Sequence, residues 1–163
     1  MASGDTLAVF TPYCNEPPAA DYATLDLRNY HPCLDFDAAT NETATFTGVL
    51  PRNYAAGGVT VNIHWAASTD TSDAHHCYWD AAFELCTGLD MDTDSFAAVN
   101  SVETDHCNAT SGIETVTAIA FTDGADMDSV IAGALFRLRI TRDAASDGMT
   151  GDAEVYAVEI KET

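Results

Sequence analysis

Histidine and cysteine, the usual ligands of zinc, stand side by side at three places in this sequence. They are His31-Pro32-Cys33, His75-His76-Cys77 and His106-Cys107. Zinc sites use spacings such as C-x₂-C or H-x₃-H, and none of these occurs here. Neighbours in a strand point to opposite faces, so His76 and Cys77 cannot both bind one ion unless the strand breaks. We therefore expect surface histidines, a buried and inert Cys77 and no cofactor, although His64 and His76 could share the polar face of two neighbouring strands.

Aspartates alternate from Asp90 to Asp94, as they do at the start of a calcium-binding loop. An EF-hand also needs Gly at position six and Glu at position twelve, but Ser95 and Ser101 stand there. A looser cation site could use one of two sets of carboxylates: Asp90, Asp92 and Asp94, or Asp123, Asp126 and Asp128. A hydrated turn is the default expectation for both, so no metal site is predicted.

Nothing in the sequence resembles catalytic machinery. The motif G-x-S-x-G is absent, and no Cys-His pair stands in a recognisable catalytic context. Acidic residues number 26, so some carboxylates will lie close together by chance. The sequence therefore predicts a protein that is not an enzyme.

The cysteines, Cys14, Cys33, Cys77, Cys86 and Cys107, make an odd number. At least one is therefore unpaired within the chain or bonded to another chain. Residues 1–10 lack the pattern of a signal peptide, so synthesis in a cytoplasm is expected, which favours free thiols. Disulfides within the chain stay an alternative, because a particle released by lysis meets an oxidising medium.

The charge is strongly acidic, with 26 acids against 6 bases and a formal net charge of -20. Residues 53–136 contain no Lys or Arg. Nucleic acids and anionic lipids are bound by clustered cations, so neither is an expected partner. Unpaired carboxylates repel one another less at high salt, so a halophilic source is one hypothesis and an acidic mesophilic protein the other.

Apolar residues recur with a period of two from residue 41 onward, the pattern of half-buried antiparallel strands. In Val59–Ala66, for example, Val59, Val61, Ile63 and Trp65 share one face. Seven or eight strands separated by turn residues, with no long helix, predict an all-β, jelly-roll-like antiparallel sandwich over residues 41–163. One helical turn is possible at Asp126–Gly133. The other expected strands are Thr43–Leu50, His76–Cys86, Ala97–Glu103, Ile113–Phe121, Phe136–Thr141 and Glu154–Lys161.

All five prolines precede residue 52, and residues 1–40 are expected to form an extended arm with short strands at Leu7–Phe10, Thr24–Arg28 and Cys33–Phe36. Such an arm could clasp neighbouring subunits through Phe10, Pro17, Pro18 and Tyr22. Half of the positive charge lies in Arg137, Arg139 and Arg142. This stripe could bind acidic residues of a neighbour, or pair within its own sheet.

Several stretches resemble a family of short β-sandwich proteins found among the virion structural genes of tailed phages. They are Ser3–Leu7, Leu34–Thr40, Val49–Tyr54, Val59–Ala67, residues 119–143 and Met149–Thr163. The resemblance implies a capsid decoration (cement) protein, usually trimeric. Its partners would be the major capsid protein and copies of itself, and it would lie on the virion surface after synthesis in the host cytoplasm. The Cys- and His-rich stretch from His75 to Cys107 departs from the family pattern.

The alternative function is a fibre or tail-tip module that binds a host glycan or receptor. Glycan sites use aromatic rings as platforms, surrounded by polar groups. Tyr54, Tyr78 and Trp79 are the candidate rings, although Trp79 falls on the core face of its strand by the period of two.

Overall fold

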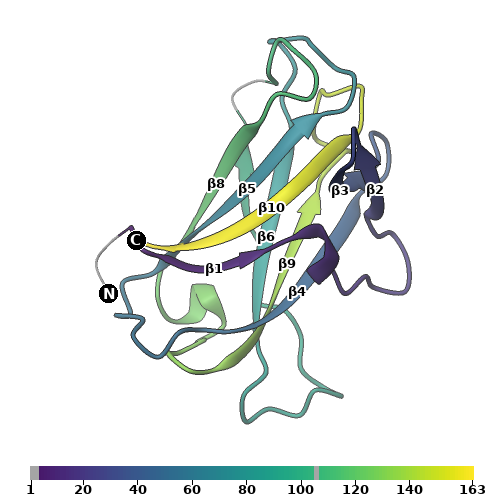
Figure 1. Cartoon of the computed structure of the whole chain (residues 1–163). Coiled ribbons are helices and arrows are strands. Elements are labelled where there is room, and N and C mark those ends of the chain that lie inside the picture. Colours follow the sequence, from purple (N-terminus) through teal and green to yellow (C-terminus); the bar gives the residue numbers. More distant parts are fainter. Residues whose placement is uncertain (1–3, 105–106) are drawn as a thin grey trace.

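Two antiparallel β-sheets pack face to face in the computed structural model, which describes residues 4–104 and 107–163 (Figure 1). The expected all-β, jelly-roll-like sandwich is confirmed. No helix in the described residues is long and apolar enough to cross a membrane. Two short 3₁₀ turns, η1 (Pro12–Cys14) and η2 (Ala125–Met127), accompany the strands, and η2 begins one residue before the helical turn expected at 126–133.

The first sheet, sheet A, is six-stranded and is built around β10. Strand β5 pairs with β10 along its whole length, whereas β3 and β1 share the opposite edge of β10, near its start and its end respectively. The full order is β2-β3-β10-β5-β8, with β1 beside β10. The strands are β1 (Thr6–Phe10), β2 (Thr24–Arg28), β3 (His31–Phe36), β5 (Val59–Ala67), β8 (Thr115–Phe121) and β10 (Ala153–Glu162).

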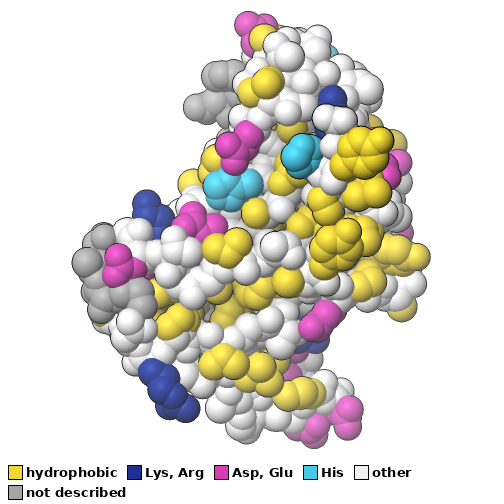
Figure 2. Space-filling model, viewed as in Figure 1, with side chains coloured by type: hydrophobic (Ala, Val, Ile, Leu, Met, Phe, Trp, Pro, Cys, Tyr) yellow, Lys and Arg dark blue, Asp and Glu magenta, His cyan; other side chains and the backbone are white. Residues whose placement is uncertain are grey.

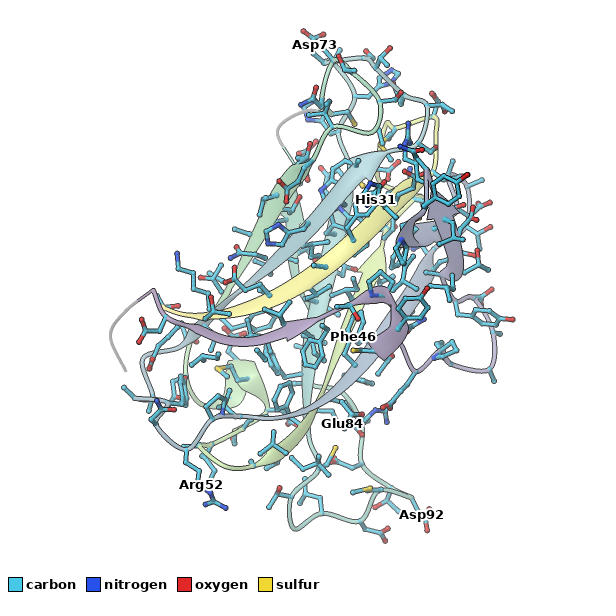
Figure 3. The ribbon with its side chains drawn as sticks, viewed as in Figure 1. His31, Phe46, Arg52, Asp73, Glu84 and Asp92 are labelled. Carbon is cyan, nitrogen blue, oxygen red and sulfur yellow. The ribbon has the colours of Figure 1, made fainter. Side chains whose placement is uncertain are left out.

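The second sheet, sheet B, has four strands in the order β4-β9-β6-β7. A long connection between β6 and β7 projects from one end of the sandwich and carries Asp92, while Asp73 lies at the opposite end (Figure 3). The strands are β4 (Glu42–Val49), β6 (Tyr78–Leu85), β7 (Asn100–Glu103) and β9 (Leu135–Arg142).

The core between the sheets follows the predicted alternation. Val59, Val61, Ile63 and Trp65 of β5 are all buried, while the residues between them are half-buried on the outer face. The rings of Trp65 and Trp79 face each other across the core with centroids 6.0 Å apart. Burial of such large rings stabilises the sandwich by roughly 1.5–3 kcal/mol for each side chain.

Residues 4–40 belong to the sandwich and do not form a separate arm. The three short strands lie close to where they were expected, but β1 and β3 pair with β10 and so complete sheet A. Phe10 is buried and stacks on Phe46 at 5.2 Å, and Phe36 is fully buried. The physical reason is that this edge of β10 and these rings would otherwise be exposed to water. Residues 15–23 run along β4, as the bonds from Glu16 N and Ala23 N to carbonyls of β4 show.

Candidate functional site

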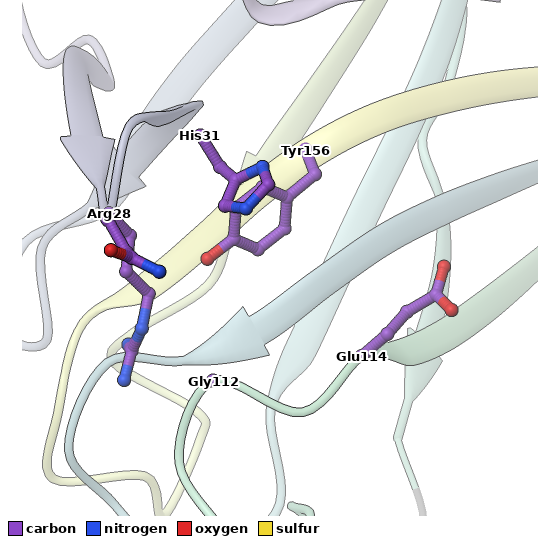
Figure 4. A pocket seen from close by; sticks show the side chains of 6 residues that line it. Arg28, His31, Gly112, Glu114 and Tyr156 are labelled. Carbon is purple, nitrogen blue, oxygen red and sulfur yellow. The ribbon is translucent and has the colours of Figure 1, made fainter.

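The outer face of sheet A carries a hollow of about 440 Å³ beside the turn between β2 and β3. Its lining residues are Arg28, Asn29, His31, Gly112, Glu114 and Tyr156 (Figure 4). A second hollow of about 340 Å³ shares Glu114 and Tyr156 with the first and is completed by Val9, His64, Ala157 and Glu159. A third, of about 330 Å³, lies near the far end of β10 and includes Thr60, Asn62 and Lys161. We call the three hollows together the sheet A groove.

Tyr156 lies on this face at a β-bulge in β10. The pairing of β10 with β5 shifts between Val155 and Ala157, so one residue is inserted. Val155 before the bulge and Val158 after it both point into the core, and Tyr156 and Ala157 between them remain half-buried on the outside. A strand without the inserted residue could not keep both valines in the core and present Tyr156 to the groove.

Tyr156 is held at its hydroxyl by an ion pair. Arg28 Nη1 lies 2.8 Å from Glu154 Oε2, and the Tyr156 hydroxyl donates to the same carboxylate oxygen at 2.9 Å. Arg28 also donates to the carbonyl of Ser68 at 3.0 Å, which anchors the β2–β3 turn to the end of β5. Burial and the hydrogen bond to Glu154 raise the pKa of Tyr156, so the ring is a neutral phenol at physiological pH. Its fixed ring therefore forms part of the floor of the first hollow.

His64 lies between two carboxylates in the middle of the groove. Its Nδ1 is 2.6 Å from Glu114 Oε1, and its Nε2 is 4.0 Å from Glu159 Oε2. Glu159 also accepts hydrogen bonds from Asn62 Nδ2, at 2.8 Å, and from the Thr6 hydroxyl. These two bonds lower the pKa of Glu159, which is therefore an ionised acceptor. Residues of β1, β5 and β10, with Glu114 just before β8, thus form one polar network.

The groove presents rings, donors and acceptors along an open path. Glu154 and Lys161 are seven positions apart on β10, so at ~3.3 Å per residue the row of hollows is about 23 Å long. Figure 2 shows histidine and acidic side chains exposed on this face of the molecule. A path of this length can bind an extended polar ligand by hydrogen bonds and by stacking on the rings.

The predicted aspartate clusters do not form a common site. Asp90 binds its own turn, since the backbone N–H of Asp92 donates to its carboxylate at 3.1 Å. Asp123, Asp126 and Asp128 accept instead from Tyr54, Thr122 and Leu85 respectively. Within residues 4–104 and 107–163, no three His, Cys, Asp or Glu side chains are grouped so that they could hold a metal ion.

Two of the predicted interface residues are part of the core, which corrects that prediction. Phe10 packs on Phe46, as described above, and Arg142 is 0 % exposed. The Arg142 guanidinium binds Asp147 at 2.8 Å and donates to the carbonyls of Phe36 and Gly151. Arg142 therefore ties the connection between β9 and β10 to the end of β3.

The other two arginines of the stripe lie on the outer face of sheet B. Arg137 pairs with Glu84 at 3.0 Å, and both Arg137 and Arg139 lie over the ring of Phe96, at 5.0 and 4.6 Å. Of the two expected roles of the stripe, Arg137 therefore has the second, pairing within its own sheet. Pro17, Pro18 and Tyr22 are exposed, so their predicted role in an interface stays a prediction.

All five cysteines are free thiols. Cys14 is exposed, whereas Cys33, Cys77, Cys86 and Cys107 are buried. Burial raises the pKa of the Cys33 and Cys107 thiols to about 11, and it also raises the pKa of the Cys77 thiol, so these sulfurs are poor nucleophiles. The expected burial of Cys77 is confirmed.

The histidine and aromatic predictions have mixed outcomes. His64 lies in sheet A, whereas His76 precedes β6 of sheet B, so the idea of a shared face is wrong. His106 lies outside the described residues. Trp79 is in the core, as its position in the period of two suggested, and Tyr54 is also buried. Tyr78 is half-buried on the outer face of sheet B.

The groove residues Arg28, Glu114 and Tyr156 had no signal of their own in the sequence, and His31 stood out only as a neighbour of Cys33. The available signal was the polar face of the 59–66 strand, which included Asn62 and His64. That face becomes a site only when residues far apart in the sequence are brought beside it by β10 and β8.

Comparison with known proteins identifies the fold. No protein-family model and no curated protein sequence matches this chain. The structure is similar to that of a xylan-binding module, CBM15, with a TM-score of 0.53, 11% identity and coverage of 96% of this chain and 97% of that one. It is also similar to the CBM22-2 xylan-binding domain of Paenibacillus barcinonensis Xyn10C, with a TM-score of 0.52, 14% identity and 92% coverage of both chains.

A third similar structure is a family GH115 4-O-methyl-α-glucuronidase. Its TM-score is 0.53 at 8% identity, and the match covers 99% of this chain but 18% of the enzyme. At such low identities these similarities establish the β-sandwich fold and nothing beyond it.

Proposed function

We propose that this chain is a non-catalytic glycan-binding module and that its ligand lies in the sheet A groove. The observation that carries the proposal is the row of hollows along β10, in which Tyr156, His31 and His64 stand among fixed polar groups. Sugars offer apolar ring faces and many hydroxyls, and they are bound by aromatic rings with hydrogen-bonding groups around them. The similarity of the fold to two xylan-binding modules supports the same function.

Each part of the groove has a definite role in this proposal. The ring of Tyr156 stacks on a sugar face, because Glu154 fixes its hydroxyl edge. The carboxylates of Glu114 and Glu159 accept hydrogen bonds from sugar hydroxyls, since each has lone pairs beyond those used by His64, Asn62 and Thr6. An open groove binds the middle of a long chain, so longer oligosaccharides bind more tightly than short ones until the groove is full.

The virion setting suggested by the family resemblance stays a prediction. A glycan-binding module on a particle would act through many copies, and multiplicity turns weak individual contacts into high avidity. The number of copies per particle separates the roles: hundreds would indicate decoration of the capsid, and a handful would indicate a fibre or tail tip.

The test is a binding titration by calorimetry against xylan, mannan and galactan oligosaccharides. We expect binding of at least one of them, and a loss of at least about fivefold in affinity for Tyr156→Ala, because truncating an aromatic anchor of a binding site costs about 1 kcal/mol or more. Tyr78→Ala is the matched control, since Tyr78 is also a half-buried tyrosine but lies on sheet B. Equal losses in the two variants, or binding that depends on Tyr78 alone, would contradict the proposed site.

A further inference from the structure

Exposed apolar side chains gather at the edge of the sandwich formed by β2. Tyr13 and Tyr22 are 68 and 42 % exposed, Leu25 and Leu27 are 53 and 58 % exposed, and Tyr30 in the next turn is 92 % exposed. Figure 2 shows exposed hydrophobic side chains on the side of the molecule where β2 and β4 lie in Figure 1. We call these five residues the β2 patch.

Three residues of the patch, Tyr13, Tyr22 and Leu25, line a groove that contains no charge. Its volume is about 250 Å³, and its lining residues are Pro12, Tyr13, Asn15, Pro17, Tyr22, Ala23, Thr24, Leu25 and Leu34. None of them is ionisable at neutral pH, although the chain carries a net charge of -20. Two copies of so acidic a protein repel each other over most of their surface. They repel each other least where uncharged patches meet.

Strand β2 also offers a free edge. In the described part of the chain β2 pairs only with β3, so its other edge has main-chain groups available. The backbone N–H of Leu27 is bonded to the neighbouring Asp26 carboxylate at 2.7 Å, which partly protects this edge. Edge strands of this kind add a further strand when a partner of suitable shape is present.

We propose that the β2 patch is the interface with a second copy of this chain. A two-fold axis sets a surface against itself, and antiparallel pairing of β2 with the partner's β2 would join the two copies of sheet A. Centring the pair on Leu27 places Asp26 opposite Arg28 of the partner subunit. Asp26 of each copy then lies opposite an Arg28 that also pairs with Glu154 of its own chain, whereas centring on Asp26 would oppose two carboxylates.

The exposed area is suited to such a contact. The exposed fractions of the three tyrosines add up to about two fully exposed side chains. At ~200 Å² for each ring side chain, this is an exposed area of about 400 Å². This is about half of the ~800 Å² that each partner buries in an interface of standard size. Leu25, Leu27 and the prolines of the groove supply further apolar area. The same surface includes the predicted contact residues Pro17 and Tyr22.

Sedimentation velocity on the full chain, over a range of concentrations and with a reductant present, tests the proposal. We expect a monomer–dimer equilibrium that 1 M NaCl strengthens, because salt screens the repulsion between the copies. Leu27→Asp should raise the dissociation constant at least about tenfold, as expected when a carboxylate is buried at the centre of an interface. Circular dichroism of the variant checks that it is folded, which its exposed position predicts.

Ile131→Asp is the matched control, because it adds the same charge at an apolar residue that is 67 % exposed but lies outside the patch. Its dissociation constant should equal that of the unmodified chain within about twofold, which corresponds to roughly 0.4 kcal/mol of binding free energy. The exposed thiol of Cys14, next to Tyr13, reports on the same surface: its labelling by a maleimide should slow as concentration rises, and should not slow in Leu27→Asp. A monomer at all concentrations, a trimer, or a dimer weakened by Ile131→Asp and not by Leu27→Asp would overturn the proposal.

Discussion

Replacing Arg142 by methionine should be among the most damaging single changes on β9. The side chain is 0 % exposed and its partner Asp147 is 2 % exposed, so water cannot replace either member of the pair. Arg142→Met keeps a long apolar stem but leaves the Asp147 carboxylate buried without its counter-charge. It also removes the donors that serve the carbonyls of Phe36, Gly151 and Met149.

The expected loss of stability follows from these lost interactions. Breaking a buried ion pair by removing one partner costs about 3–5 kcal/mol. In a protein of this size each kcal/mol lowers the melting temperature by roughly 2–4 °C, so the expected fall is about 6–20 °C. Because the pair is buried, the loss should be nearly the same at low salt and in 1 M NaCl.

Urea unfolding followed by circular dichroism measures the free energy of unfolding of each variant. Arg139→Met is the control, since Arg139 lies on the same strand but contacts Phe96 on the outer face, where a cation–π contact is worth about 0.5–1 kcal/mol. The double variant Arg142→Met with Asp147→Leu should recover part of the loss, because no unpaired charge then remains. A loss below about 1 kcal/mol for Arg142→Met, equal to that of Arg139→Met, would refute the argument from burial.

Three further predictions concern pH, salt and thiol chemistry. Burial, with the nearby charges of Asp152 and Glu154, raises the pKa of Asp35 from 3.8 to about 6, so stability present at low pH is lost as the pH rises from about 4 to 6. Asp35→Asn should therefore raise the melting temperature at pH 7, by ~2–4 °C if the gain in stability is about 1 kcal/mol, and leave it unchanged near pH 3. A rise in melting temperature near pH 3 with none at pH 7 would contradict this direction. The free energy of unfolding should rise with NaCl because the net charge is -20, and a flat or falling dependence would remove the argument from unpaired carboxylates. A maleimide should label one thiol per native chain, Cys14, and all five after denaturation; rapid labelling of a buried cysteine would be inconsistent with the core as described.

The strands could be predicted from the sequence because burial repeats every second residue. Val59–Ala67 is the clearest case, since four apolar residues on one face meet the core and the residues between them face water. The same period also explains why Arg142 is buried. Arg137 and Arg139 share a face, but Arg142 is an odd number of residues away and therefore points into the core.

The sheet A groove could not be predicted because it depends on pairing between distant segments. Arg28 and Glu154 meet only because β3 brings β2 beside β10. The bulge beside Tyr156 leaves Ala157 on the outer face as well, which no local pattern of hydrophobicity reveals. The arm was predicted from its prolines, but apolar residues of the same segment, such as Phe10 and Phe36, instead complete the core.

The most direct test of the account is a titration of the labelled protein with the oligosaccharide that binds best, followed by amide chemical shifts. We predict that the shifts concentrate on the outer-face residues of β5, β8 and β10 around Tyr156 and His64. Shifts centred on β6 and β7 of sheet B would contradict the proposed site. An absence of any change with xylan, mannan or galactan oligosaccharides would contradict the proposed function for those ligands.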